Sequence, residues 1–270
     1  MKVQGKVFVV TGAGGGIGAE IVSALVARGA KVAAIDLKDD ALQLLKEKLD
    51  DKGQSVSVHA LSVSDLAAVE QLPEAVIKAH GPVDALINCA GIIQPFVKVN
   101  DLEYDAIERV MHVNFYGTLY MTKAFLPHLL QRPEAYIANV SSMGGFLPVP
   151  GQSVYGASKA AVKLLTESLY AELLGTNVHV SVVFPGATNT NITQNSGVKA
   201  PSMPNAGQGQ QSYAMLSPAD AAAIIIKGIE KNKPQIFTGK DSRMMNKLYR
   251  LNPVFATRLI SKQMRSLLKG

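Results

Sequence analysis

The sequence holds few of the residues that build disulfide, metal or membrane proteins. Its 270 residues include a single cysteine, Cys89, so an internal disulfide framework and a cysteine metal cluster are excluded. Cys89 lies in an apolar run, and we expect a packed core thiol rather than a reactive one. No run of about 20 apolar residues occurs, so no transmembrane helix is expected. The N-terminus lacks the pattern of a signal peptide, and we expect a cytoplasmic protein.

Charge is also sparse, and it is unevenly spread. Charged residues make up 18% of the chain and hydrophobic residues 47%, which is apolar enough to bury a substantial core. The net charge is +6, but eleven Lys/Arg against two Asp/Glu follow residue 226, so the rest of the chain carries −3. This distribution argues against a nucleic-acid binder. The five histidines are scattered without metal-ligand spacing, and no catalytic metal is expected.

Strand-like apolar segments alternate with helical patterns along most of the chain. This alternation predicts a doubly wound α/β domain, with a parallel sheet covered by helices on both faces. We assign residues 1–240 to this single Rossmann-type domain. The predicted strands are 6–12, 31–36, 55–61, 83–91, 135–142, 178–186 and 235–239, and the predicted helices include 17–29, 40–53, 103–131, 154–174 and one that Ser217 caps, while Ser64 or Asp65 caps the helix that follows the third strand.

Two segments depart from this alternation. Residues 191–216 are polar, rich in Gly, Pro, Gln and Asn, and too long for a simple connection. We expect a substrate lid there, with a disordered excursion as the alternative. Residues 241–270 form a basic tail with an amphipathic helix after Pro253. That helix could contact an anionic membrane peripherally, pack on a partner subunit, close over the substrate pocket or pack on its own domain.

A glycine-rich turn follows the first predicted strand, with Gly12, Gly16, Ile17 and Gly18 leading into a helix. Such a turn brings backbone amides and a helix N-terminus up to a pyrophosphate. Asp36 ends the second strand, where a carboxylate accepts both hydroxyls of an adenosine ribose and repels a 2′-phosphate. Leu37 follows it, and no arginine lies in the turn. NAD(H) is therefore favoured, with NADP(H) as the less favoured alternative.

Tyr155 and Lys159 stand one helical turn apart in the segment SVYGASKAAV. At that spacing their side chains lie on one face of a helix. A free phenol has a pKa near 10, too high for efficient proton abstraction at neutral pH, and a neighbouring cation lowers it. We therefore expect Tyr155 to be an acid/base group with a pKa lowered by Lys159.

Further motifs occur in an order that resembles the short-chain dehydrogenase/reductase family over about residues 3–240. They are T-G-x-x-x-G-x-G at 11–18, NCAG at 88–91, Asn114 in VNFYG, Ser142 thirteen residues before Tyr155, and Y-x-x-x-K at 155–159. The resemblance implies a sheet of about seven strands and an oxidoreductase that transfers a hydride between NAD(H) and a secondary alcohol or ketone. It also implies a homodimer or homotetramer packed through the two long helices.

The resemblance assigns roles to individual residues. Ser142 would bind the substrate oxygen, and Lys159 would also hold the nicotinamide ribose. Asn114 would hold a water molecule in a relay from Lys159 to solvent. The further cofactor contacts that it implies are Ser62, Val63, Asn88, Ala90, Gly91, Pro185, Gly186, Thr188 and Thr190. Ser62 is a departure, because the family commonly has aspartate there against the adenine ring.

The expected substrate walls are mostly apolar: Gln94, Met143, Phe146 and Val149, with Ile93, Phe96 and the 191–216 lid. No Arg or Lys is expected to meet a carboxylate or phosphate, so we infer a neutral, moderately apolar substrate. Two rivals are a cofactor-binding regulator without turnover and a lyase or epimerase that uses NAD transiently. A regulator would be expected to have lost Ser142, Tyr155 or Lys159, and all three are present.

Overall fold

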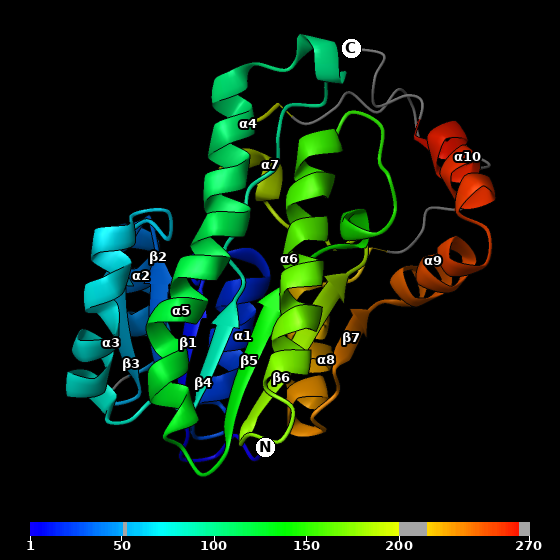
Figure 1. Ribbon diagram of the computed structural model, residues 1–270. Coiled ribbons are helices and arrows are strands. Elements are labelled where there is room, and N and C mark those ends of the chain that lie inside the picture. Colours follow the sequence, from blue (N-terminus) through cyan, green and yellow to red (C-terminus); the bar gives the residue numbers. More distant parts are fainter. Residues whose placement is uncertain (51–52, 200–214, 265–270) are drawn as a thin grey trace.

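The computed structural model describes residues 1–50, 53–199 and 215–264, and its centre is a seven-stranded sheet (Figure 1). The strands are β1 (Val7–Thr11), β2 (Lys31–Asp36), β3 (Val56–Ala60), β4 (Ala85–Asn88), β5 (Ala135–Val140), β6 (Val178–Pro185) and β7 (Gln235–Thr238). All neighbouring strands are parallel, in the order β3-β2-β1-β4-β5-β6-β7. The predicted doubly wound α/β fold is confirmed.

The helices alternate with the strands, and two of the predicted caps are present. Ser217 Oγ accepts from the amide of Asp220 at 3.0 Å, and Asp65, rather than Ser64, caps the helix after β3. The helices are α1 (Gly16–Val26), α2 (Asp39–Leu49), α3 (Leu66–His80), α4 (Tyr104–Met111), α5 (Gly117–Leu130), α6 (Ser153–Glu172), α7 (Ile192–Asn195), α8 (Pro218–Glu230), α9 (Lys240–Leu251) and α10 (Pro253–Gln263), with the short turns η1 (Val99–Asp101), η2 (His112–Tyr116) and η3 (Met143–Gly145).

The sheet is sandwiched between two helical layers (Figure 1). Helices α1, α2 and α8 pack on one face, and α3, α5 and α6 pack on the other. Every residue of β1 and of β5 is buried. Strands covered on both faces need nearly continuous apolar sequence, which is why residues 7–11 and 135–140 are apolar except for Thr11 and Asn139.

The strand order reverses direction at β1, which lies between β2 and β4. At such a point the connections leave toward opposite faces and open a crevice at the carboxyl ends of the strands. The segments that follow β1 and β4 meet there, because the amides of Cys89 and Ala90 both donate to Thr11 Oγ1, at 3.0 and 3.1 Å. A bound ligand is therefore expected at this edge of the sheet.

The predicted helix 103–131 is divided into α4, the π-helical turn η2 and α5. Asn114 lies in the middle of η2. Single π-helical turns are rare and are frequent at functional sites. The apolar spacing of the segment does not distinguish a π turn from an α turn, so the sequence predicts one continuous helix.

The C-terminal part holds one unexpected helix. α9 begins at Lys240, and Ser242 Oγ donates to the carbonyl of Phe184 at 2.9 Å, so α9 packs on the end of β6. The predicted helix after Pro253 is confirmed as α10. Residues 200–214 of the expected lid and the last six residues lie outside the described residues. Among the described helices, none has the length and apolar character that crossing a bilayer requires.

Candidate active site

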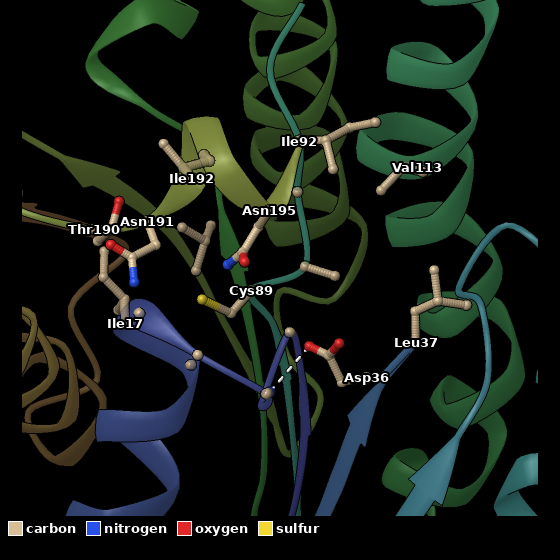
Figure 2. Close-up of a pocket in the computed structure, with 18 of the residues that line it drawn as sticks. Ile17, Asp36, Leu37, Cys89, Ile92, Val113, Thr190, Asn191, Ile192 and Asn195 are labelled. Carbon is tan, nitrogen blue, oxygen red and sulfur yellow. Dashed lines mark hydrogen bonds between the residues drawn. The ribbon is translucent and has the colours of Figure 1, made fainter. Parts of the chain in front are cut away.

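A cavity of about 560 Å³ opens at the carboxyl edge of the sheet (Figure 2). Its volume lies in the range of small-molecule and cofactor sites, about 300–1,000 Å³. Its walls come from the ends of all the strands from β1 to β6 and from α6 and α7. The predicted site residues that line it are Gly12, Gly16, Ile17, Gly18, Asp36, Leu37, Ser62, Val63, Ala90, Gly91, Ser142, Tyr155, Lys159, Pro185, Gly186, Thr188 and Thr190.

The glycine turn forms one end of the cavity. Gly12 has a φ of +70°, and a Cβ on it would lie 2.8 Å from the amide nitrogen of Ala90, so only glycine fits there. Helix α1 starts at Gly16 without a side-chain cap and without an acidic residue in its first turn. Its N-terminal amides and dipole therefore stay available for an anion. These features fit the pyrophosphate of a dinucleotide.

Asp36 stands beside the glycine turn, with its carboxylate held by two backbone amides. Its Oδ2 accepts from Gly14 at 3.0 Å, the dashed line in Figure 2, and its Oδ1 accepts from Lys38 at 3.1 Å. A Cβ on Gly14 would lie 2.8 Å from Asp36 Cγ. Each oxygen keeps a second lone-pair site. The carboxylate is therefore oriented, and it can still accept two hydroxyl groups.

The segment after β6 forms another wall, with Pro185, Gly186, Thr188 and Thr190. It is held from behind by Asp241 of α9, whose Oδ2 accepts from the amide of Ala187 at 2.9 Å. Sequence reasoning misses Asp241, because no local pattern links it to a loop 54 residues away. Helix α9 thus supports the site as well as extending the fold.

Ser142, Tyr155 and Lys159 meet in this cavity from two elements, the end of β5 and α6. Ser142 Oγ accepts from the amide of Gly144 at 3.0 Å, and its hydroxyl group also interacts with the phenol of Tyr155. Lys159 is 4% exposed, and its Nζ donates to the carbonyl of Val140 at 3.0 Å. The side chain of Ser141 turns the other way, as expected on a strand, and donates to the carbonyl of Lys159.

The pKa of Tyr155 differs from the sequence expectation. Burial raises this pKa above its ordinary value, and a hydrogen bond with Ser142 offsets only part of the rise. Lys159 is not among the groups that lower this pKa, and burial lowers the pKa of the Lys159 ammonium itself to about 8. Desolvation disfavours the charged form of each group. In this structure the phenol is therefore a protonated group at neutral pH.

Asn114 lies behind the cavity rather than on its surface. Its side chain is fully buried, with Oδ1 accepting from the amide of Ile92 at 2.8 Å. Its Nδ2 donates to the carbonyl of Ile92 and to Ser158 Oγ, each at 2.9 Å. A Cβ on Gly91 would lie 3.3 Å from Asn114 Oδ1 and 3.0 Å from Lys159 Nζ. The η2 turn therefore brings Asn114 close to the lysine without exposing it.

Asn88 and Gln94 also lie beneath the surface of the cavity, although both are predicted from the sequence to contact ligands. Asn88 is 3% exposed, and its Nδ2 donates to Asn139 Oδ1 at 2.8 Å, which joins β4 to β5. Gln94 is fully buried, and its Oε1 accepts from the amides of Val154 at 2.7 Å and Tyr155 at 2.9 Å. Gln94 thus caps the first turn of α6, a contact that sequence reasoning misses.

Met143, Phe146 and Val149 are expected substrate walls, and they do not line this cavity. Met143 and Phe146 pack instead against a separate apolar cluster that includes Leu147 and Met245. The carbonyl of Val149 accepts from the amide of Gln152 in the turn before α6. These apolar side chains are used in part to attach α9 to the domain.

Cys89 lines the cavity, and burial raises the pKa of its thiol to about 11. A thiol that stays protonated at neutral pH is a poor nucleophile, which agrees with the expected unreactive thiol, but Cys89 is half-buried at the cavity wall rather than fully packed in the core. Within residues 1–50, 53–199 and 215–264, no group of three or more His, Cys, Asp and Glu side chains could hold a metal ion.

Several cavity residues are absent from the sequence prediction. Figure 2 places Asn191, Ile192 and Asn195 across from the glycine turn. They come from α7 and the residue before it. These residues lie inside the segment predicted to be a lid, so that prediction was the signal that could have found them. The others that the prediction omits are Gly14, Gly15, Lys38, Asp40, Ala41, Leu61, Cys89, Ile92, Val113, Val140 and Ser141.

The buried Lys159 predicts a pH-dependent stability. Its pKa is about 8 in the folded protein against 10.5 for a free lysine. Between these values the unfolded chain binds a proton that the folded chain does not, so the wild-type stability rises with pH through that window. Urea unfolding of wild type and Lys159→Met at pH 7, 8, 9 and 10 measures this. Above pH 8, the free energy of unfolding of the wild type should rise relative to that of the variant by up to about 1.4 kcal/mol per pH unit. A difference that does not change with pH contradicts the burial argument.

Comparison with known proteins places these features in a family. Residues 6–200 match the model of the short chain dehydrogenase family. The protein SadH of Mycobacterium tuberculosis is 34% identical over 268 residues, which cover 96% of this chain and 95% of SadH. A short-chain dehydrogenase/reductase from Burkholderia phymatum in complex with NAD superposes with a TM-score of 0.82 at 28% identity, covering 93% of this chain and 96% of that one. A short-chain dehydrogenase from Burkholderia cenocepacia in complex with NADP gives 0.78 at 26% identity, covering 98% and 99%.

The family match covers both the glycine turn and the Ser142, Tyr155 and Lys159 positions. The matched fold also binds a nicotinamide dinucleotide in the solved relatives. This chain therefore belongs to the short-chain dehydrogenase/reductase family and is an NAD(P)-dependent oxidoreductase.

Proposed function

We propose that the protein transfers a hydride between NAD(H) and a neutral, moderately apolar secondary alcohol or ketone, with Tyr155 as the acid/base residue. One observation carries the proposal. Ser142, Tyr155 and Lys159 line the same cavity as the glycine turn and Asp36. A proton-transfer group and a dinucleotide cradle thus share one space, as coupled hydride and proton transfer requires.

The cofactor preference rests on Asp36. Its carboxylate faces the cavity beside the α1 turn and is held by the amides of Gly14 and Lys38. It can accept the two hydroxyls of an adenosine ribose, and its charge repels a 2′-phosphate. Lys38 lines the same region, but Asn195 Oδ1 lies 3.5 Å from its Nζ. We therefore infer that the protein prefers NAD(H) to NADP(H).

The proton transfer is assigned to Ser142, Tyr155 and Lys159. The protonated Tyr155 can donate to the carbonyl oxygen of a ketone during reduction, and in the reverse direction it must accept the proton of the alcohol. Ser142 can donate its hydroxyl hydrogen to the same oxygen and stabilise its developing negative charge. Lys159 does not set the resting pKa of Tyr155, but it lines the same cavity and is largely protonated at pH 7, so its charge can favour the phenolate that forms when the alcohol is oxidised. When bound, the nicotinamide supplies or accepts the hydride, and its oxidised form adds a positive charge.

The substrate class rests on the charges of the described cavity walls. The cationic side chains among them are Lys38, near Asp36, and Lys159, which is held by the carbonyl of Val140. Ile92 and Val113 add apolar surface to the same walls. A carboxylate or phosphate on the substrate would find no free cation there among the described residues. A neutral alcohol or ketone fits these walls better than an anionic one.

A substrate screen tests the proposal directly. Secondary alcohols of graded size are incubated with NAD⁺, and the matching ketones with NADH, while absorbance at the NADH band is followed. Cyclic and long-chain neutral compounds should react, and their carboxylate-bearing analogues should react at least tenfold more slowly. A faster reaction of the anionic analogues contradicts the proposed substrate class.

Ser142→Ala serves as the matched control for this screen. It removes one donor to the substrate oxygen and leaves the glycine turn and Asp36 intact, so kcat should fall about 100-fold while NADH binding is retained. Tight NADH binding without turnover of any substrate would support the rival reading as a regulator. Tightly retained cofactor with product formed but no change in NADH would support the lyase or epimerase reading.

A further inference from the structure

The two C-terminal helices bury one face and expose another. On the inner face, Met245 of α9 and Ala256 and Ile260 of α10 pack with Leu147 in one apolar cluster. These contacts fix both helices to the domain. Their outward-facing residues therefore form a surface of defined composition rather than a loose tail.

The outer face of α9 is both basic and apolar. At 100° per residue, the positions of Lys240, Arg243, Met244, Lys247 and Leu251 fall within one stripe along the helix. All five are exposed, whereas Met245, on the opposite side, is buried. The stripe therefore presents three cations interleaved with two apolar side chains to the surroundings.

A groove with a volume of about 790 Å³ borders this stripe. Lys240, Arg243, Met244 and Lys247 form its α9 wall. The other wall is largely apolar and includes Leu216, Ile224 and Phe237. The cations of α9 thus stand at the edge of an apolar depression, an arrangement that suits an anionic group attached to a hydrocarbon chain.

The turn from α9 to α10 carries the most exposed apolar residues of this region. Leu251 is 85% exposed, Val254 59% and Phe255 53%. Figure 1 shows this turn at the outer edge of the molecule, away from the sheet. On α10, Arg258 and Lys262 are exposed on the same side as Phe255. Large apolar side chains gathered on a surface indicate an interaction site.

The charge of the region is predominantly positive. Residues 242–264 contain five Lys or Arg and no Asp or Glu. Asp241, at the start of α9, also lines the groove, and its carboxylate accepts from the amide of Ala187. A surface that joins apolar side chains to unbalanced positive charge complements the headgroups of anionic phospholipids. It would repel a second copy of itself, and the contact expected between copies involves α5 and α6 instead.

We propose that the outer face of α9 and α10 binds the surface of an anionic phospholipid bilayer. Leu251, Val254 and Phe255 enter the boundary between headgroups and acyl chains. The cations of the two helices pair with lipid phosphates, and the groove beside α9 receives part of a lipid. This inference concerns attachment to a membrane and does not depend on the substrate or on the acid/base role of Tyr155.

Vesicle co-sedimentation of the full chain tests the proposal. Vesicles of phosphatidylcholine alone are compared with vesicles that contain 30% phosphatidylglycerol, at low and at high salt. The wild type should bind the anionic vesicles at least tenfold more tightly than the neutral ones, and high salt should reduce this binding. Equal binding to both vesicle types, or binding to neither, overturns the proposal.

Paired variants separate the two contributions. Leu251→Ser with Phe255→Ser removes apolar contact, and Arg258→Glu with Lys262→Glu reverses two charges; each pair should weaken binding at least tenfold. The matched controls are Leu44→Ser with Leu174→Ser and Lys48→Glu with Lys78→Glu, which alter exposed residues elsewhere and should change binding less than threefold. Retained NADH binding verifies that each variant is folded.

Two outcomes contradict the assignment of this surface. Equal losses in the test pairs and in the control pairs would mean that only net charge or general hydrophobicity matters. A lower molar mass of Leu251→Ser with Phe255→Ser in light scattering, with vesicle binding unchanged, would mean that the surface is covered by a second copy of the chain.

Discussion

Replacement of Tyr155 by phenylalanine is expected to lower kcat by about 10³-fold while the Kd for NADH changes less than about threefold. General acid/base catalysis by a positioned side chain contributes about 10²–10⁴-fold. The variant removes only the phenolic oxygen. The ring and the backbone of residue 155, whose amide donates to Gln94 Oε1 at 2.9 Å, stay in place. The variant should therefore lose turnover while it keeps its affinity for NADH.

The measurement is steady-state turnover of the best substrate from the screen, together with fluorescence titration of NADH. The pH profile adds a second test. Because burial raises the pKa of Tyr155, ketone reduction should persist to higher pH than a free phenol would allow, since the proton donor stays protonated. Alcohol oxidation should rise with pH as the phenolate becomes populated. Wild-type turnover by Tyr155→Phe would remove the acid/base assignment altogether.

Replacement of Asp36 by alanine is expected to change the ratio of NADH to NADPH affinity by about 10³-fold in favour of NADPH. A hydrogen bond to a charged group contributes about 1.5–3 kcal/mol, and Asp36 can offer two to the ribose. NADPH also carries the 3′-hydroxyl, so only the bond to the 2′-hydroxyl changes the ratio, by about 10- to 150-fold at about 1.4 kcal/mol for each tenfold change. Removal of the repulsion on a 2′-phosphate adds to it.

Asp36→Asn provides the control for geometry. The Asp36 carboxylate also accepts from the amide of Gly14 in the glycine turn, so alanine disturbs that turn as well as the ribose contact. Asparagine keeps one acceptor for Gly14 and loses the charge. It should weaken NADH binding less than alanine does and still relieve the repulsion of NADPH. An unchanged NADH to NADPH ratio in both variants would assign ribose recognition to another group.

The pattern of apolar and polar residues along the sequence was sufficient to predict the architecture and most of the residues that line the cavity. Continuous apolar runs predict a sheet buried on both faces. Each strand shows this pattern in its own residues, so no knowledge of contacts with distant segments is needed to recognise it. The glycine turn, Asp36 and the Tyr155–Lys159 spacing are likewise local. Each is set by a single strand end or a single helical turn, so short stretches of sequence were enough to identify them.

The tertiary structure decided what depends on contacts between distant segments. Gln94 caps α6 across 61 residues, and Asp241 holds the loop after β6 across 54. No periodicity links such pairs. Asn88 and Asn114 are buried because neighbouring elements cover them, which places their side chains behind the cavity wall rather than on its surface.

The pKa of Tyr155 shows the same division most clearly. The sequence alone determined that a phenol and an ammonium share one helix face, because helical spacing is a local property. Only the packed structure decided the direction of the shift. Desolvation depends on every atom that covers the phenol, and in this protein it raises the pKa despite the nearby lysine.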